Sequence, residues 1–469
     1  MATLWRHMKA IIPILNEHSK RPFYLQLYDT IKRSILSGEI TKDEKLPSLR
    51  SLSKTLGLSL TTVEMAYNQL SVEGYIYSKP QSGFFVSNIS YAHSANVKND
   101  LFMDSDFVKS SMATQSPSLQ YDLSCFDFNK WKKCLNKILT EYTHLLLSES
   151  EPQGESVLRY EISKYLYRSR GVTCNQTQIV IGAGTQQITG QLTLILSKMN
   201  IRHVAVEEPG YLPVKNIFRD RGFSITPVLV EKDGINIQML KTPNRSAAYV
   251  SPSNQFPTGA VMPVGKRYEL LEWAIRSNSI IIEDDYDSEL RYFGKPIPAL
   301  QGLDTNECVV YLGSFSSTLF PSIRISYMVL PNSMAEIFQT LQKDYTQTCS
   351  KTEQLTLALF MEHGFYQTNI RKLRSLYAQK LQAVLLAIHK YGSDFVKPIN
   401  TSSGINMIIN VTSAQKAEAL CQKALEHGVL VIPVSHYTDE KSKTNSSLIL
   451  YYNQIPIERI ENTIQNILQ

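Results

Sequence analysis

The sequence lacks the features of a membrane, secreted or zinc-binding protein. Its six cysteines are widely scattered, with no CxxC pair and no cysteine-histidine cluster at the spacing of a zinc site. No apolar run approaches the roughly 20 residues that span a bilayer, and the first residues contain no apolar signal segment. We therefore expect a cytoplasmic protein with reduced thiols, no metal site and no membrane partner.

Charge is unevenly distributed along the chain of 469 residues, whose formal net charge is +6. Residues 1–88 contain 11 basic and 7 acidic side chains, so +4 of this excess lies near the N-terminus. A local basic excess is compatible with nucleic acid but does not prove it. The apolar fraction of 43% is typical of folded protein, and the length favours two domains as a starting point.

Three short helices are predicted in the first ninety residues. The first follows Pro22 and stops before Gly38, with apolar side chains at helical spacing. Ser48 and Ser59 are expected to cap the second and third helices, and Gly57 separates the two. This spacing is typical of a helix-turn-helix.

Two β-prone runs follow, 75–77 and 84–86, and the turn between them contains Gly83. They predict a hairpin with the shape of a wing. On the third helix, Thr61, Thr62 and Gln69 lie off the apolar stripe, where their hydroxyls and amide could reach DNA. A small helical bundle with a hairpin is the alternative that the pattern leaves open.

Residues 22–88 resemble the GntR winged-helix family through the stretches Leu46–Leu52, Leu58–Val63 and Glu73–Tyr75. The resemblance implies that double-stranded DNA faces Arg50, Thr61 and Thr62, and that the wing tip consists of Lys79, Ser82 and Gly83. The family usually has arginine where this chain has Leu60. Losing a guanidinium removes a strong contact to phosphate or guanine, so we expect an altered operator specificity.

From Ser90 to about Gln120 the apolar periodicity fails, and small polar residues dominate. We therefore predict a DNA-binding domain over residues 20–88, a flexible linker over 89–120 and a large domain over 121–469. A linker of this length permits, without proving, exchange of domains between the subunits of a homodimer.

The large domain is predicted to be α/β. Apolar strand-like segments alternate with helical ones, which favours a parallel sheet covered on both faces, with functional residues at the carboxyl ends of strands. A glycine-rich turn at 181–187 favours an anion. The hydroxyls of 313–317, followed by Arg324, complete a predicted phosphate site. The acidic segment 283–287 fits either a heterocycle or a solvated loop.

These segments resemble a fold-type I, class I aminotransferase, and the whole chain resembles the MocR subfamily of GntR regulators. The supporting stretches are Pro152–Gly154, Tyr167–Val172, Glu208–Tyr211, Gln255–Gly259 and Arg324–Tyr327. The resemblance implies that Asp284 pairs with the pyridinium nitrogen of pyridoxal phosphate, Tyr286 with its ring hydroxyl, and that Tyr211 lies near the ring. It assigns the phosphate to Thr185, Gln186, Ser314, Ser316 and Arg324.

One departure decides the expected chemistry. The family pattern Ser-Phe-Ser-Lys reads Ser314–Ser317 here, so Ser317 replaces the lysine that would form the Schiff base. No other lysine lies between Lys295 and Lys343. We therefore expect no catalytic residue, no transamination, and pyridoxal phosphate bound non-covalently at best.

Two further departures concern the surroundings of the pocket. The family's carboxylate-binding arginines are absent from the stretches occupied here by Leu212–Pro213 and Asn453–Gln454. The proline-containing loop that usually borders the pocket is also missing, because 121–124 runs almost directly into 128–131. A ligand carboxylate would therefore lack its bidentate partner.

The sequence predicts a DNA-binding transcription regulator whose aminotransferase-like domain dimerises. Whether that domain also senses a small-molecule effector, or has only a structural role, stays open at this point. The alternative function is an aminotransferase, dependent on pyridoxal phosphate, with an appended DNA-binding domain.

Overall fold

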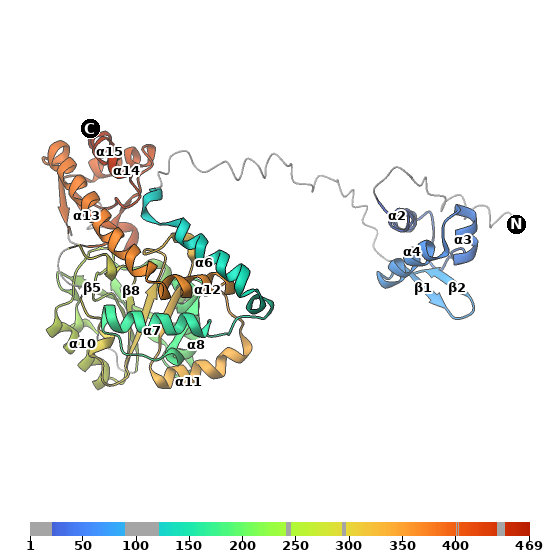
Figure 1. Cartoon of the computed structure of the whole chain (residues 1–469), viewed down its shortest axis with the longest axis horizontal. Coiled ribbons are helices and arrows are strands. Elements are labelled where there is room, and N and C mark those ends of the chain that lie inside the picture. Colours follow the sequence, from blue (N-terminus) through green and yellow to red (C-terminus); the bar gives the residue numbers. More distant parts are fainter. Residues whose placement is uncertain are drawn as a thin grey trace. The chain divides into compact units, whose positions relative to one another are not determined.

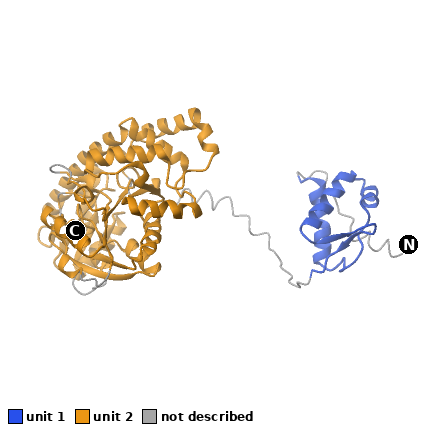
Figure 2. Cartoon of the chain, turned by 90° about the horizontal axis from the view of Figure 1, so that it is seen from below, with its two compact units in different colours: residues 1–108 blue, residues 109–469 orange. Residues whose placement is uncertain are grey.

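The computed structural model describes residues 21–89, 122–240, 245–292, 297–399, 401, 403–438 and 446–469. The chain divides into two compact units, residues 1–108 and 109–469 (Figure 2). Nearly all of the predicted linker, 89–120, lies outside the described residues. The domain boundaries drawn from the sequence therefore stay a prediction.

The first unit contains the predicted helices and hairpin. Its elements are α2 (Phe23–Leu36), α3 (Leu49–Leu56), α4 (Leu60–Val72), β1 (Ile76–Lys79) and β2 (Gly83–Val86). The expected caps are present: Ser48 Oγ accepts the Ser51 N–H at 3.2 Å, and Ser59 Oγ accepts the Thr62 N–H at 3.1 Å. Gly57 ends α3 in the left-handed conformation, with φ 66°.

The hairpin is tied to the helices by a segment that sequence reasoning did not predict as extended. Residues before α3 run beside β2, where the Leu46 N–H donates to Phe84 O at 2.9 Å and the Val86 N–H donates to Glu44 O at 3.0 Å. Tyr67 of α4 is buried and donates its hydroxyl to Pro47 O at 3.0 Å. The wing is therefore hydrogen-bonded to the segment before α3, and that segment is hydrogen-bonded to α4.

The second unit is built on an eight-stranded sheet of order β3-β10-β9-β8-β7-β4-β5-β6 in the described residues. Its strands are β3 (Ile179–Gly182), β4 (His203–Glu208), β5 (Ser224–Glu231), β6 (Gly234–Ile235), β7 (Ala247–Val250), β8 (Ile280–Asp285), β9 (Val309–Ser314) and β10 (Ser326–Val329). The five strands from β9 to β5 are parallel, as predicted.

The predicted parallel arrangement does not extend to the two edges of the sheet. β10 runs antiparallel to β9 and to β3, and β6 runs antiparallel to β5. A parallel neighbour needs a crossover of about a dozen residues or more, usually containing an α-helix. Only two residues connect β5 to β6, and residues 315–325, between β9 and β10, contain no α-helix. Alternation of apolar residues within one strand cannot reveal this reversal.

Helices cover both faces of the sheet (Figure 1). One face packs against α8 (Thr185–Lys198), α9 (Leu212–Asp220) and α11 (Asn332–Leu341). The other face packs against α6 (Phe128–Glu141), α7 (Ser156–Arg170), α10 (Val264–Arg276) and α12 (Lys351–Glu362). β3 shows the alternation, because Val180 joins the first core whereas Ile179 and Ile181 join the second.

The long helix α13 (Phe365–Gly392) leads to a smaller α/β part (Figure 1). Its antiparallel sheet has the order β11-β12-β14-β13 and packs with two further helices. These elements are β11 (Val396–Ile399), β12 (Asn406–Val411), α14 (Ala414–Glu426), β13 (Val431–Pro433), β14 (Ser447–Tyr451) and α15 (Ile460–Leu468). Among the described residues, no helix is long and apolar enough to span a bilayer, and no cluster of side chains is suited to a metal ion.

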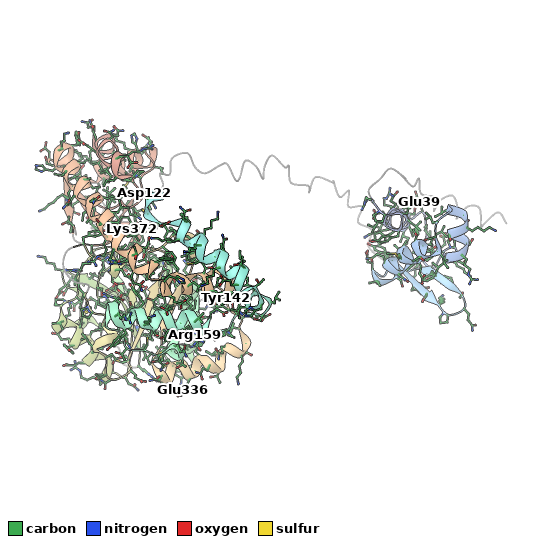
Figure 3. The ribbon with its side chains drawn as sticks, viewed as in Figure 1. Glu39, Asp122, Tyr142, Arg159, Glu336 and Lys372 are labelled. Carbon is green, nitrogen blue, oxygen red and sulfur yellow. The ribbon has the colours of Figure 1, made fainter. Side chains whose placement is uncertain are left out.

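Gly154 offers a test of the packing around β3. Its φ is +98°, an added Cβ would lie 2.6 Å from Ile181 Cβ, and Arg159 (labelled in Figure 3) donates Nε to its carbonyl at 2.9 Å. We expect Gly154→Ala to lower the free energy of unfolding by about 2 kcal/mol or more, because both the backbone and the core must shift. Urea denaturation of the full chain measures this.

Gly190 is the matched control, because it lies inside α8 and an added Cβ would meet nothing within 4 Å. Gly190→Ala should stabilise the second unit by about 0.5–1 kcal/mol, through reduced backbone entropy of the unfolded chain. Equal effects of the two substitutions would contradict the packing described here.

Candidate functional site

The predicted DNA-facing side chains of the first unit lie on its surface or at the end of the hairpin. Arg50 and Thr61 are exposed on α3 and α4, and Lys79 and Ser82 are exposed beside the hairpin turn. Gly83 has φ +106° and begins β2. Thr62 is half-buried, with its hydroxyl 2.8 Å from Ser59 Oγ, so it also supports the start of α4.

Gln69, interpreted from the sequence as a DNA-facing amide, is engaged within the unit. Its Nε2 donates to Glu73 Oε1 at 2.7 Å. The other oxygen of Glu73 accepts from the Tyr28 hydroxyl at 2.5 Å and from Lys32 Nζ at 3.2 Å. These hydrogen bonds, that from Gln69 foremost, lower the pKa of Glu73 to about 2. These hydrogen bonds connect Tyr28 and Lys32 of α2 to Glu73 at the end of α4, and they hold the two helices together.

Lys45 is a surface cation near the wing that the sequence did not single out. It is exposed and pairs with Phe85 in an isolated antiparallel bridge, and its Cε would lie 3.5 Å from a Cβ added at Gly83. Lys79 Nζ lies 4.6 Å from the centre of the Phe85 ring. Two cations therefore flank the hairpin. Lys45 lies beside the hairpin because the segment before α3 is extended and pairs with β2, which the sequence did not predict.

In the second unit, a cavity of about 320 Å³ brings together all eight predicted cofactor-binding residues and Ser317. Its lining consists of Thr185, Gln186, Tyr211, Phe256, Asp284, Tyr286, Ser314, Ser316, Ser317, Arg324, Ile405, Asn406, Tyr437 and Tyr451. The strand order explains this convergence. Ser326, the first residue of β10, pairs with Gly182 at the end of β3 and with Ser314 at the end of β9.

One end of the cavity is suited to an anion. An added Cβ at Gly184, the residue before α8, would lie 2.3 Å from Arg324 Nη2, so the guanidinium lies directly against this turn. Ser316 Oγ is buried and has no hydrogen-bond partner within the described structure. A guanidinium, an unpaired hydroxyl and the N-terminus of α8 are the groups that bind phosphate in proteins. These residues therefore fit the phosphate of pyridoxal phosphate.

The acidic segment on β8 is buried, so the alternative of a solvated loop was wrong. Three of its four carboxylates have structural partners. Glu283 accepts the N–H groups of Leu300 and Gln301 at 2.7 and 2.9 Å, Asp285 pairs with Arg170 at 2.8 Å, and Asp287 accepts a hydrogen bond from Asn254 Nδ2 at 2.8 Å. Asp284 remains to line the cavity.

Asp284 has one direct partner in this structure, because the Tyr249 hydroxyl donates to its Oδ2. Burial raises the pKa of Asp284 to about 7, partly offset by that hydrogen bond. A pyridinium nitrogen carries a proton and a positive charge, so it would favour the ionised carboxylate. The position and chemistry of Asp284 therefore fit the ring nitrogen of the cofactor.

Much of the lining is aromatic, and the sequence did not assign Phe256, Tyr437, Tyr451 or Asn406 to the cavity. The Phe256 ring centre lies 4.9 Å from that of Tyr437 and 6.0 Å from that of Tyr211. Tyr437, Tyr451 and Asn406 come from the smaller sheet or its edge. These residues are far along the chain from the glycine-rich turn, so no local sequence pattern indicated that they line the cavity. The stretch containing Phe256 had supported the family resemblance alone.

Comparison with known proteins identifies both units. The family described as "Bacterial regulatory proteins, gntR family" matches residues 23–86, and "Aminotransferase class I and II" matches residues 121–445. The chain is 39% identical to the uncharacterized HTH-type transcriptional regulator YdeL of Bacillus subtilis, over 91% of this chain and 92% of that one. It is 30% identical to the probable rhizopine catabolism regulatory protein MocR of Rhizobium meliloti, over 90% and 88%. The chain belongs to the MocR subfamily of GntR regulators.

Another relative is the HTH-type pyridoxine biosynthesis transcriptional regulator PdxR of Corynebacterium glutamicum, which is 30% identical over 92% of both chains. The fold of the second unit is that of aminotransferases. The kynurenine aminotransferase of Pyrococcus horikoshii superposes with a TM-score of 0.65, at 22% identity, over 79% of this chain and 95% of its own. Such low identity establishes the fold alone.

In this MocR-type chain, Ser317 lines the cavity and donates its hydroxyl to Tyr286 O at 2.6 Å. Arg324 is the only cationic side chain among the lining residues described. Two buried lysines elsewhere in the unit have carboxylate partners: Lys215 pairs with Glu208 at 3.1 Å, and Lys380 pairs with Asp122 at 2.6 Å. No described lysine lines the cavity in place of the missing one.

The pKa of Asp284 generates a prediction for the ligand-free protein. Because burial raises this pKa to about 7, above that of an aspartate in the unfolded chain, protonation stabilises the folded unit. This stabilisation is complete below about pH 4 and is lost as the pH rises through about 7. Asp284→Asn should therefore lose less stability than the parent between about pH 5 and about pH 8.

Scanning calorimetry of the full chain at the two pH values measures this difference. Glu336, exposed on α11 (Figure 3), supplies the control Glu336→Gln, which removes a surface charge. The interpretation fails if Asp284→Asn and the parent lose the same stability over this range.

Proposed function

We propose that this protein is a transcription regulator that binds double-stranded DNA through residues 21–89, and that its second unit binds a phosphorylated pyridine without transaminating. The family supports the regulatory role. A single observation carries the rest: the cavity keeps its phosphate-binding and ring-binding groups, while Ser317 stands where a lysine would form the Schiff base.

Different residues of the cavity would bind different parts of the ligand. Arg324 and Ser316, with Thr185, Gln186 and Ser314, would hold the phosphate, and Asp284 would keep the proton on the ring nitrogen. When bound, pyridoxal phosphate supplies a ring that withdraws electrons from a substrate carbon. Ser317 is neutral, and its hydroxyl proton is directed at Tyr286 O. It therefore has neither an amine for covalent attachment nor a base that would move a substrate proton.

In the proposal, Arg50, Thr61 and Thr62 contact the DNA through the helix-turn-helix, while Lys79, Ser82 and Gly83 approach it from the wing. A homodimer is part of the proposal, because two copies of the first unit would bind two half-sites. Exposed apolar side chains along α6, the following turn and α7 supply a surface suited to a second copy: Leu139, Leu147, Val157 and Tyr160.

The wing contact is tested by Lys79→Ala. Removing one phosphate contact should weaken binding similarly on different sequences and reduce the slope of log affinity against log salt by about 1. Fluorescence anisotropy with fragments from the chain's own upstream region, over a series of salt concentrations, measures the slope. Lys397→Ala, which removes an exposed cation from the smaller sheet, should leave affinity and slope unchanged. Failure of the parent to bind at low salt would reject the DNA-binding role.

The absence of transamination is tested chemically. After incubation with pyridoxal phosphate and a panel of amino acids, the full chain is reduced with borohydride and its peptides are analysed by mass spectrometry. We expect no adduct on a cavity peptide and no keto acid, since the lining offers no amine. A known aminotransferase treated in parallel verifies the trapping. An adduct in the cavity together with turnover of an amino acid would establish an enzyme instead.

A further inference from the structure

We propose that the cavity selects pyridoxamine phosphate, the amine form of the ligand, over the aldehyde pyridoxal phosphate. The inference rests on the proposed binding of a phosphorylated pyridine. Both forms carry the same phosphate and ring nitrogen, so Arg324, Ser316 and Asp284 would not distinguish them. Discrimination must come from the groups that meet the substituent opposite the ring nitrogen, where the family's lysine would react.

The hydrogen bond of Ser317 determines whether its hydroxyl acts as a donor or as an acceptor towards that substituent. Its hydroxyl proton is donated to Tyr286 O at 2.6 Å, which leaves the lone pairs of Oγ as acceptors. An ammonium group has three donors and no acceptor, so it complements Oγ and the carbonyl together. An aldehyde oxygen is an acceptor only, so it could form a hydrogen bond with neither of these two acceptors.

The charge of the surroundings favours the same form. Arg324 is the sole cation among the described lining residues, and it lies against the phosphate-binding turn. Three buried carboxyl groups, Glu207, Asp284 and Asp287, raise the pKa of Tyr286 electrostatically, and of these only Asp284 is among the described lining residues. Burial raises the pKa of Asp284 to about 7, so a fraction of this carboxyl group is ionised near neutral pH and would attract a cation in the cavity. A ligand ammonium would supply the charge that the absent lysine no longer brings.

Replacement of the lysine by serine should also weaken binding of the aldehyde form more than binding of the amine form. Its retention in a lysine-containing site includes a covalent bond, whereas the amine is held by non-covalent contacts alone. An adduct between the aldehyde and an amino acid is disfavoured as well, because the lining contains no second cation to pair with a carboxylate. The geometry therefore favours the free amine form over both alternatives.

Calorimetric titration of the full chain with pyridoxamine phosphate, pyridoxal phosphate and pyridoxine phosphate tests the proposal. The third compound has a hydroxymethyl group and separates the effect of charge from that of size. We expect the amine form to bind at least about tenfold more tightly than either of the others, a difference of about 1.4 kcal/mol. Equal or tighter binding of the aldehyde, without an adduct by mass spectrometry, would overturn the selectivity while leaving the cavity as a ligand site. Failure of all three to bind would overturn the proposed ligand site too.

Restoring the amine should reverse the preference. In Ser317→Lys, the new amine condenses with the aldehyde with loss of water, so the protein should absorb in the visible range and bind the aldehyde form more tightly. Ser393→Lys, exposed at the end of α13, is the matched control and should keep the preference for the amine. Ser317→Ala removes the acceptor with less disturbance and should reduce the preference several-fold. An unchanged ratio of affinities in both Ser317 variants would contradict the role assigned to this hydroxyl.

Discussion

The cavity depends on the contact between the guanidinium of Arg324 and the turn that begins α8. That contact requires a glycine at position 184, since any Cβ there would overlap the guanidinium. It also requires β10 to lie between β3 and β9, because the reversed strand brings the turn containing Arg324 beside the glycine-rich turn. The order of the strands, rather than any single motif, brings together the groups that we propose to bind phosphate.

Neighbouring acidic residues on β8 differ in their surroundings, because two have partners within the fold and one lines the cavity. Alternate side chains of a strand point to opposite faces. Glu283 and Asp285 are held by backbone N–H groups and by Arg170, whereas Asp284, between them, reaches the cavity and accepts the Tyr249 hydroxyl. A buried carboxylate without a cation is costly. A ligand that brought a positive charge next to Asp284 would offset that cost.

Much of the fold could be predicted because its signals are local. Ser48, Gly57 and Ser59 mark helix ends through short-range hydrogen bonds and backbone conformation, and each occurs where expected. Strand ends and family resemblance predicted the residues that the structure brings together in the cavity, and their roles in binding a phosphate and a ring stay a prediction. The reversal of β10, the extended segment at Lys45 and the cavity wall at Tyr437 were missed. Each depends on contacts between distant parts of the chain, which no local pattern encodes.

In the proposed function, serine in place of one lysine separates ligand binding from catalysis on an aminotransferase fold. The most direct measurement is a crystal structure of the full chain grown with pyridoxamine phosphate. The account predicts the phosphate at Arg324 and Ser316, the ring nitrogen at Asp284, the amine at Ser317, and no continuous density between the ligand and any side chain. A covalent bond from the ligand to a lysine, or a cavity without ligand at saturating concentration, would contradict it.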